Sequence, residues 1–302
     1  MKTKDFPRLR RQAIDDIIVH LNSDYAKNTK GYAKHYDMFL TRLQSPEFHS
    51  FLLPLEGEIV KHTTPVKLSY EDLRLPFDNC VFEYEVKHEK QYDKDGREFT
   101  MTHTIVIVQK WQVDDGTCIL VLPLWRIMES NGVSYWTPPM NGLALLPTAT
   151  ISVNGDSTID VSGFTVIGSS WDKAQERYKE MQVKDAISNI SMELSVVAHF
   201  AMLCGCDNIT AKKVHTVDKK LAKRTAERNG TPHNDYWMLD VYMNEEYEGS
   251  ESGSGGSHSS PRFHVRRGHI RRYQTGKTTW VKQHTVGTPE LGVIKKDYRV
   301  MA

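Results

Sequence analysis

The chain has 302 residues, of which 39% are hydrophobic and 25% are charged, and its formal net charge at pH 7 is +1. This composition provides enough apolar residues for a sizeable core and excludes a wholly disordered protein. The average charge also excludes nucleic-acid binding by a uniformly basic surface, so any such function would require local clusters of Lys and Arg.

The cysteines, Cys80, Cys118, Cys204 and Cys206, are too few for a disulfide framework in a chain of this length. We expect buried free thiols, and no metal or other cofactor, because Cys204 and Cys206 have no further ligand residues at suitable spacing. No segment is long and apolar enough for a membrane helix, and the charged N-terminus is unlike a signal peptide. The sequence therefore predicts a cytoplasmic protein.

Two amphipathic helices are predicted over residues 10–22 and 32–44, within an N-terminal helical segment at 10–45. Apolar side chains recur there at the spacing that places them on one face of a helix. These residues are Ile14, Ile17, Ile18 and Leu21 in the first helix, and Tyr32, Tyr36, Phe39, Leu40 and Leu43 in the second.

Between residues 66 and 167 the apolar residues recur with a period of two, which is typical of β-strands. Asp114-Asp115-Gly116 separates two runs rich in β-branched and aromatic residues and indicates a tight hairpin turn. Residues 92–96 indicate a second, longer connection between strands. We therefore expect an antiparallel sheet of five or more strands over residues 66–167.

Leu75-Pro76-Phe77 leads into an alternating strand that contains Phe82 and Tyr84. One interpretation is a groove at a sheet edge that accepts a partner peptide by strand addition. An ordinary core strand explains the same pattern more simply.

Two further helices are predicted within residues 170–204, over 170–182 and 184–204. The second carries an apolar stripe, which consists of Ile187, Ile190, Leu194, Val197 and Ala201. A sheet followed by helices indicates an α+β fold in which the helices pack on one face of the antiparallel sheet. With a short strand at 235–244, this core domain would cover residues 1–247.

Basic residues cluster in two segments after these helices. Residues 211–229 carry seven Lys or Arg against two acidic residues, a net charge of +5. The Gly/Ser-rich stretch at 248–260 is predicted to be a flexible linker or loop. A basic β segment at 261–302 follows, and residues 262–302 carry ten Lys or Arg against two acidic residues, a net charge of +8.

The basic C-terminal segment alternates in a pattern that predicts β-strands. Gly268 indicates a bulge, and Thr275-Gly276-Lys277 indicates a hairpin turn. Arg donates paired hydrogen bonds to phosphate and aromatic rings stack on bases, so the segment is a candidate RNA-binding surface. The candidate nucleic-acid-binding residues are Arg262, His264, Arg266, Arg267, His269, Arg271, Arg272, Tyr273, Lys277, Trp280, Lys282 and His284.

Three other interpretations of this segment remain open. It could be a solvated hairpin whose aromatic residues belong to a core, or it could bind a protein partner in a non-enzymatic regulatory or structural role. His264, His269 and His284 could also include an acid and a base for RNA cleavage, with the arginines stabilising the developing negative charge. We expect binding rather than catalysis, because histidines in a basic cluster tend toward lowered pKa values and commonly serve only as hydrogen-bonding groups.

The order of residues in this segment resembles the C-terminal signature of a widespread family of phage-encoded proteins that includes a type V-A anti-CRISPR. In this chain the signature consists of His264, Arg266, Gly268, His269, Arg271, Gly276, Trp280, Val281 and His284, with Tyr298 further on. Leu75-Pro76-Phe77, Asn208-Ile209 and residues 228–232 resemble other parts of the family in the same order. Ile270 stands where the anti-CRISPR has Trp, and the Gly/Ser linker is particular to this chain.

The resemblance implies a phage protein that acts in the host cytoplasm against a bacterial defence system. The anti-CRISPR of this family recognises the N-terminal peptide of the CRISPR effector during translation and promotes destruction of the effector mRNA. We therefore expect a binding protein that recognises a protein or nascent peptide and contacts RNA or the ribosome through its basic segment. Its effect would be lower expression of the target. The resemblance identifies neither the target peptide nor the residues that bind it.

Overall fold

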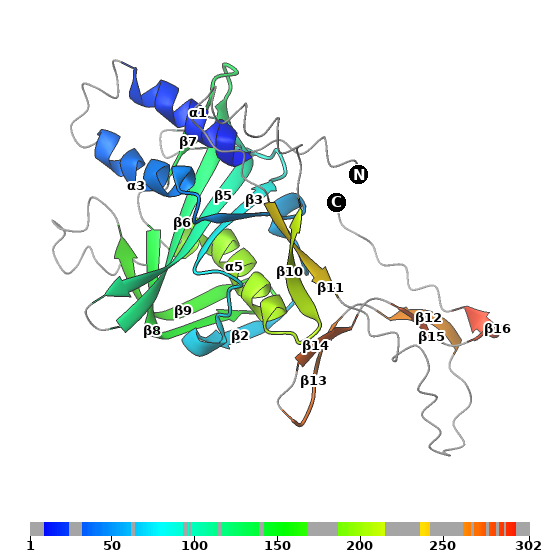
Figure 1. Ribbon diagram of the computed structural model, residues 1–302. Helices are drawn as coiled ribbons and strands as arrows, with labels where there is room; N and C mark the ends of the chain where they lie inside the picture. Colours follow the sequence, from blue (N-terminus) through cyan, green and yellow to red (C-terminus); the bar gives the residue numbers. More distant parts are fainter. Residues whose placement is uncertain are drawn as a thin grey trace. The chain divides into compact units, whose positions relative to one another are not determined.

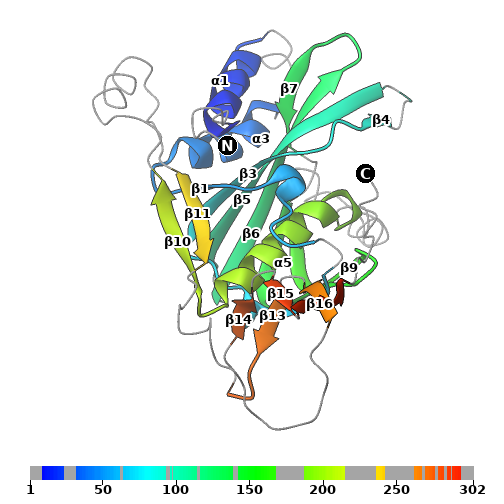
Figure 2. The same ribbon diagram turned by 90° about the vertical axis from the view of Figure 1, so that its right-hand side faces the viewer.

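The computed structural model, drawn in Figures 1 and 2, contains two compact units. We call residues 1–202 and 211–238 the sheet unit, and residues 203–210 and 239–302 the tail unit. The structure describes residues 9–23, 32–61, 64–92, 96, 98–113, 116–138, 142–167, 187–214, 236–241, 262–266, 269–275, 278–281, 284–286 and 288–293.

The described helices agree with the apolar stripes in the sequence. They are α1 (Leu9–Leu21), α3 (Tyr32–Gln44) and α5 (Ser191–Cys204). The first two confirm the predictions over 10–22 and 32–44, and α5 confirms most of the helix predicted over 184–204. The helix predicted over 170–182 lies outside the described residues. No described helix is long and apolar enough to cross a membrane.

The described residues form one large sheet of eleven strands. Its strands are β1 (His49–Leu52), β2 (Val66–Ser69), β3 (Asn79–Glu85), β4 (Lys90–Tyr92), β5 (Glu98–Val113), β6 (Gly116–Glu129), β7 (Ser134–Thr137), β8 (Gly142–Val153), β9 (Ile159–Ile167), β10 (Ile209–Val214) and β11 (Tyr236–Val241). The main strand order is β10-β11-β1-β3-β5-β6-β8-β2, while β4 pairs with β5, β7 with β6 and β9 with β8.

The antiparallel sheet predicted over residues 66–167 is confirmed from β2 to β9. The long β5–β6 hairpin closes at the predicted turn, with Val113 opposite Gly116. The second predicted connection joins β4 to β5, with Tyr92 opposite Glu98. The whole sheet is mixed, however, because β1 runs parallel to both β3 and β11.

Different helices cover the two faces of this sheet, as Figures 1 and 2 show. Neighbouring residues of a strand point to opposite faces. In β3, Val81 belongs to the core cluster of α1 and α3, whereas Phe82 packs against Phe200 of α5 at a centroid distance of 4.3 Å. The α+β class is therefore confirmed, but the sequence prediction placed the helices on one face only. The run Cys80-Val81-Phe82 is apolar at every position because both faces of the strand are buried.

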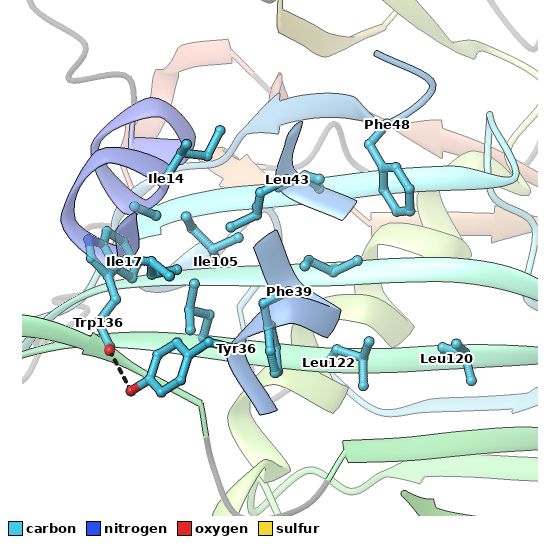
Figure 3. Packing of buried hydrophobic residues seen from close by; sticks show 14 of the residues in the cluster. Ile14, Ile17, Tyr36, Phe39, Leu43, Phe48, Ile105, Leu120, Leu122 and Trp136 are labelled. Carbon is cyan, nitrogen blue, oxygen red and sulfur yellow. Dashed lines mark hydrogen bonds between the residues drawn. The ribbon is translucent and has the colours of Figure 1, made fainter. Parts of the chain in front are cut away.

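The face under α1 and α3 contains the core cluster shown in Figure 3. Tyr36 and Leu43 of α3 are buried, as the apolar stripe predicts, and the Tyr36 hydroxyl donates a 3.0 Å hydrogen bond to the carbonyl of Trp136. In α1, Ile14 and Ile17 are buried, but Ile18 is 36% exposed. The apolar stripe therefore predicts the buried face of α1 correctly, although Ile18 lies at the margin of that face.

The opposite face is built from aromatic rings. Phe51 of β1 lies edge-on to Phe200 at 5.0 Å and to Phe82 at 6.1 Å, and all three side chains are fully buried. Tyr84 of β3 is buried on the same face. The interpretation of β3 as an ordinary core strand is confirmed. A peptide groove at Phe82 and Tyr84 is wrong, because β3 lies in the interior of the sheet between β1 and β5.

The tail unit contains the strands of the basic segment. They are β12 (Arg262–Arg266), β13 (His269–Arg272), β14 (Thr278–Val281), β15 (His284–Val286) and β16 (Thr288–Val293). β12 pairs with β15 and β16 in a three-stranded sheet, and β13 pairs with β14 in a two-stranded sheet. The hairpin predicted around Thr275-Gly276-Lys277 is confirmed by the antiparallel β13–β14 pair. The predicted linker at 248–260 lies outside the described residues, and so do residues 215–229 of the first basic segment.

Candidate nucleic-acid interface

A short turn after α5 holds β14 in the tail unit. The backbone N–H of Asp207 donates to the carbonyl of Thr278 at 2.9 Å, and the Thr278 hydroxyl donates to the carbonyl of Gly205 at 2.7 Å. The side-chain amide of Asn208 donates to the carbonyl of Trp280 at 2.8 Å and accepts from the Trp280 N–H at 2.9 Å. We call these four hydrogen bonds the latch.

The Asn208 side chain takes the place of a neighbouring strand. An amide carries both a donor and an acceptor, as a peptide group does. It therefore satisfies the N–H and the carbonyl of Trp280 together, which are the two groups that a strand would pair with. The turn itself is closed by a hydrogen bond from the Ile209 N–H to the carbonyl of Cys206 at 3.1 Å.

The register of the β13–β14 hairpin divides its side chains between two faces. Arg271 is opposite Thr279, and Ile270 is opposite Trp280. Because directly opposite residues share a face and successive residues alternate, Arg271 and Trp280 lie on opposite faces of the hairpin. The two residues therefore cannot contribute to one flat binding surface, although the sequence places both among the candidate contacts.

Arg271 pairs instead with Tyr273. The guanidinium carbon of Arg271 lies 5.1 Å from the centre of the Tyr273 ring, within the range of a cation–π contact. Arg271 is exposed and Tyr273 is half-buried. The structure thus brings together one phosphate-binding group and one aromatic ring of the predicted set, at the exposed end of the hairpin. We call them the Arg271–Tyr273 pair.

The predicted histidines fall in two different sheets. In the three-stranded sheet, Arg266 is opposite His284 and His264 is opposite Val286. His269 lies in the two-stranded sheet, opposite Val281. The register of the two sheets fixes only the backbone positions of these residues, so catalysis by the histidines stays a prediction.

The other basic residues predicted to bind RNA lie at strand ends or outside the described residues. Arg262 begins β12 and Arg272 ends β13. Arg267, Lys277 and Lys282 lie outside the described residues.

The latch residues were not predicted from the sequence. The signature drew attention to Asn208 only as one of several similar positions, and it gave no role to Gly205 or Thr278. Asn208 and Trp280 are 72 residues apart. No periodicity or local turn pattern relates residues at such a separation, so the sequence carries no signal for this contact.

The sheet unit offers a second surface feature, an aromatic cluster at the start of β1. The His49 ring lies 4.0 Å from Phe77 and 5.6 Å from Trp237, and Phe77 lies 4.5 Å from Trp237. All three side chains are half-buried. Burial lowers the pKa of His49, and the nearby charge of Lys213 lowers it further, so the ring is neutral at pH 7. Aromatic residues are enriched in protein interfaces, which makes this cluster a candidate contact for a protein partner.

One carboxyl group is fully buried beneath α5. Glu193 accepts a 2.7 Å hydrogen bond from the indole N–H of Trp125. Burial raises the pKa of Glu193 to about 7, although the Trp125 bond opposes this rise. Burial raises the pKa of the Tyr84 hydroxyl, and the nearby Glu193 carboxyl group raises it further. The described residues contain no group of three or more His, Cys, Asp or Glu that could hold a metal ion.

The cysteines also belong to the folded core. Cys80, Cys118 and Cys206 are buried, Cys204 is half-buried, and none of them forms a disulfide. The prediction of buried free thiols is thus confirmed for three of the cysteines. Burial raises the pKa of Cys80 to about 12, which keeps this thiol protonated and unreactive at neutral pH.

The sequence of this chain matches a known protein family. The model of the anti-CRISPR type V subtype A2 family (AcrVA2-like) matches residues 51–287, which is most of the chain. The chain belongs to this anti-CRISPR family. No curated protein matches the sequence significantly.

The range of the family match shows which elements of this chain belong to the region that the family shares. It begins at Phe51 in β1 and ends just after β15, so it includes the sheet, α5, the latch and the β13–β14 hairpin. Helices α1 and α3 precede it. The resemblance inferred from the tail signature is therefore confirmed at the level of the family.

Proposed function

We propose that the protein is a phage-encoded anti-CRISPR that recognises a protein or nascent-peptide target and engages RNA through its basic tail. The result of this engagement is lower expression of the target. Family membership supports the action against a CRISPR system. The observation that supports RNA contact is the Arg271–Tyr273 pair, with its exposed guanidinium, on a hairpin held by the latch.

The chemistry of the pair suits RNA. The planar guanidinium of Arg271 can donate two parallel hydrogen bonds to a phosphate, and Tyr273 offers a ring for stacking. The other basic residues of the segment 262–302, which carries a net charge of +8, supply attraction along the RNA backbone.

The protein target is proposed to bind the sheet unit. The half-buried cluster of His49, Phe77 and Trp237 is a surface where rings are already held by one another, so little side-chain freedom is lost on binding. This assignment separates the two partners, with the peptide on the sheet unit and RNA on the tail unit.

Removal of four arginines tests the RNA contact. Replacement of Arg266, Arg267, Arg271 and Arg272 by Ala is expected to weaken RNA binding by about tenfold or more in 0.1 M salt, because each phosphate-binding charge contributes to counterion release. The variant should also show a shallower dependence of affinity on salt concentration. Equilibrium binding of a labelled RNA to the full chain, measured over a series of salt concentrations, gives both quantities.

A charge-matched variant controls for the change in net charge. Lys61, Lys67, Arg74 and Lys90 are exposed in the sheet unit, and their replacement by Ala removes the same number of cations. This variant should bind RNA as the wild type does. Equal RNA affinity for the four-arginine variant and the wild type would refute RNA binding by the tail.

The same preparation separates binding from cleavage. Labelled RNA incubated with the purified chain should remain intact if the tail is a contact surface. Cleavage that disappears in a His269→Ala variant would instead support the catalytic alternative.

A further inference from the structure

We propose that the β13–β14 hairpin takes single-stranded RNA, with one unpaired base stacked on the Arg271–Tyr273 pair and with Asn208 as the positioning residue that holds the hairpin. This inference rests on the proposed RNA binding of the tail. To that function the inference adds the class of RNA that is bound, single-stranded RNA, and the side chains that select this class.

The hairpin needs support from outside its own strands. β13 and β14 have only four residues each, and a two-stranded hairpin of this size is marginally stable in water. The latch supplies four hydrogen bonds along the other side of β14, from the turn at residues 205–208. β14 therefore has partners on both sides, and the hairpin has a fixed base.

Asn208 makes half of the latch with one side chain. Its amide donates to the carbonyl of Trp280 and accepts from the Trp280 N–H. Alanine at this position can do neither. The N–H and the carbonyl of Trp280 would then bind water or be left without a hydrogen bond. Trp280 is paired with Ile270 across the hairpin, and its neighbour in β14, Thr279, is paired with Arg271. The position of Trp280 therefore also fixes the position of Arg271.

The Arg271–Tyr273 pair is the part of the hairpin that can discriminate between forms of RNA. The guanidinium carbon of Arg271 lies over the Tyr273 ring, 5.1 Å from its centre, so a cation and an aromatic ring are already in contact before any ligand binds. An unpaired base can stack on the Tyr273 ring, whereas the bases of a duplex are stacked on one another and are not available. Preference for single strands follows from the stacking, since phosphate contacts alone would bind both forms.

The first experiment compares two kinds of RNA and two substitutions of Tyr273. The full chain is titrated into a labelled single-stranded RNA and into a duplex that contains the same sequence. Tyr273→Leu is expected to weaken binding to the single strand by about tenfold, because it removes the ring, and Tyr273→Phe by less than about twofold. Affinity for the duplex should change little in either variant.

The second experiment tests the positioning role of Asn208. Asn208→Ala is expected to accelerate hydrogen exchange at the Trp280 amide and to weaken single-strand binding by about fivefold or more. Asn189→Ala, at an exposed position just before α5, is the matched control and should change neither quantity. An unchanged thermal transition of the full chain shows that Asn208→Ala leaves the protein folded.

The outcomes separate this inference from the proposed function. If the wild type binds no RNA at all, the proposed function itself fails. If the wild type binds single strands and duplexes equally, and Tyr273→Leu behaves as Tyr273→Phe does, RNA binding stands and the stacking inference is overturned. If Asn208→Ala accelerates exchange at Trp280 without weakening single-strand binding, the latch is structural and Asn208 is not a positioning residue.

Discussion

A Glu193→Gln variant is expected to be more stable than the wild type at pH 8, by on the order of 3 kcal/mol, and to lose this advantage near pH 4.5. Glu193 is fully buried in the first turn of α5, and burial raises its pKa from 4.5 to about 7. The neutral amide of Gln avoids the unfavourable burial of a carboxylate. Its carbonyl oxygen can still accept the hydrogen bond from Trp125.

The sign of the effect follows from proton binding. Between pH 4.5 and about pH 7 the folded protein keeps the proton on Glu193, while the unfolded chain has released it. Stability falls as pH rises wherever the folded state binds more protons, by about 1.4 kcal/mol for each pH unit per group. The contribution of the protonated carboxyl group is therefore complete below pH 4.5 and is lost as pH rises through 7. Glutamine removes this dependence.

Urea unfolding followed by tryptophan fluorescence, repeated from pH 4.5 to 8, measures the difference between the two proteins. His49 and His103 also have lowered pKa values, but their contributions are shared by wild type and variant and cancel in the difference. Glu47→Gln, at an exposed position, controls for the loss of one negative charge. A stability difference between Glu193→Gln and wild type that stays constant over the pH range would show that the carboxyl group is not protonated in the fold.

The elements of this fold were largely predictable from local patterns. An apolar stripe in α1 or α3, or an alternating pattern in a strand between 66 and 167, arises because one surface of the element is buried against a core. Periodicity is a local property, so it identifies elements but not their neighbours. The two faces of the sheet illustrate this limit. The continuous apolar run at 80–82 is compatible with helices on both faces, yet nothing local states that α1 and α5 lie on opposite sides.

The candidate site was predictable in composition but not in geometry. The sequence identified Arg271, Tyr273 and Trp280 as members of one basic and aromatic set. The hairpin register then separated Trp280 from Arg271, since one residue of offset changes the face. The support for the hairpin came from Asn208, whose bonds with Trp280 depend on how the chain returns to the turn after α5.

Arg10 shows the same limit in the core. Arginine in a charged N-terminal segment is ordinarily exposed, but the Arg10 side chain is buried. Its guanidinium donates to the carbonyls of Leu43 at 2.7 Å, Ser45 at 2.6 Å and Phe48 at 2.6 Å. The backbone N–H of Arg10 donates to the carboxylate of Glu83 at 3.0 Å, which places a negative charge at the first turn of α1.

These contacts join three separate parts of the sheet unit. Arg10 connects α1 to the last turn of α3 with the loop that follows it and, through Glu83, to strand β3. Burial lowers the pKa of Arg10 to about 10, and the charge of Glu83 opposes this fall, so the guanidinium remains charged at neutral pH. A buried charge of this kind is stable only while its partners are present.

Arg10→Met is therefore expected to lower the free energy of unfolding by about 3 kcal/mol or more, because it leaves three carbonyl groups and the Glu83 carboxylate without the cation. Arg10→Lys should be nearly as destabilising, since a single ammonium cannot reach acceptors spread along residues 43–48 as the guanidinium fork does. Urea unfolding at pH 7 measures both variants.

The neighbouring residue provides a matched control for this test. Arg11 lies on the same turn of α1 but is partly exposed, and within the described part of the chain it forms a 3.7 Å surface ion pair with Asp15. Arg11→Met should change the free energy of unfolding by no more than about 0.5 kcal/mol. Equal losses for Arg10→Met and Arg11→Met would mean that the buried network contributes no more than a surface charge. The family match begins only at Phe51, so a large loss for Arg10→Met would also show that the sheet of this member depends on helices outside the shared region.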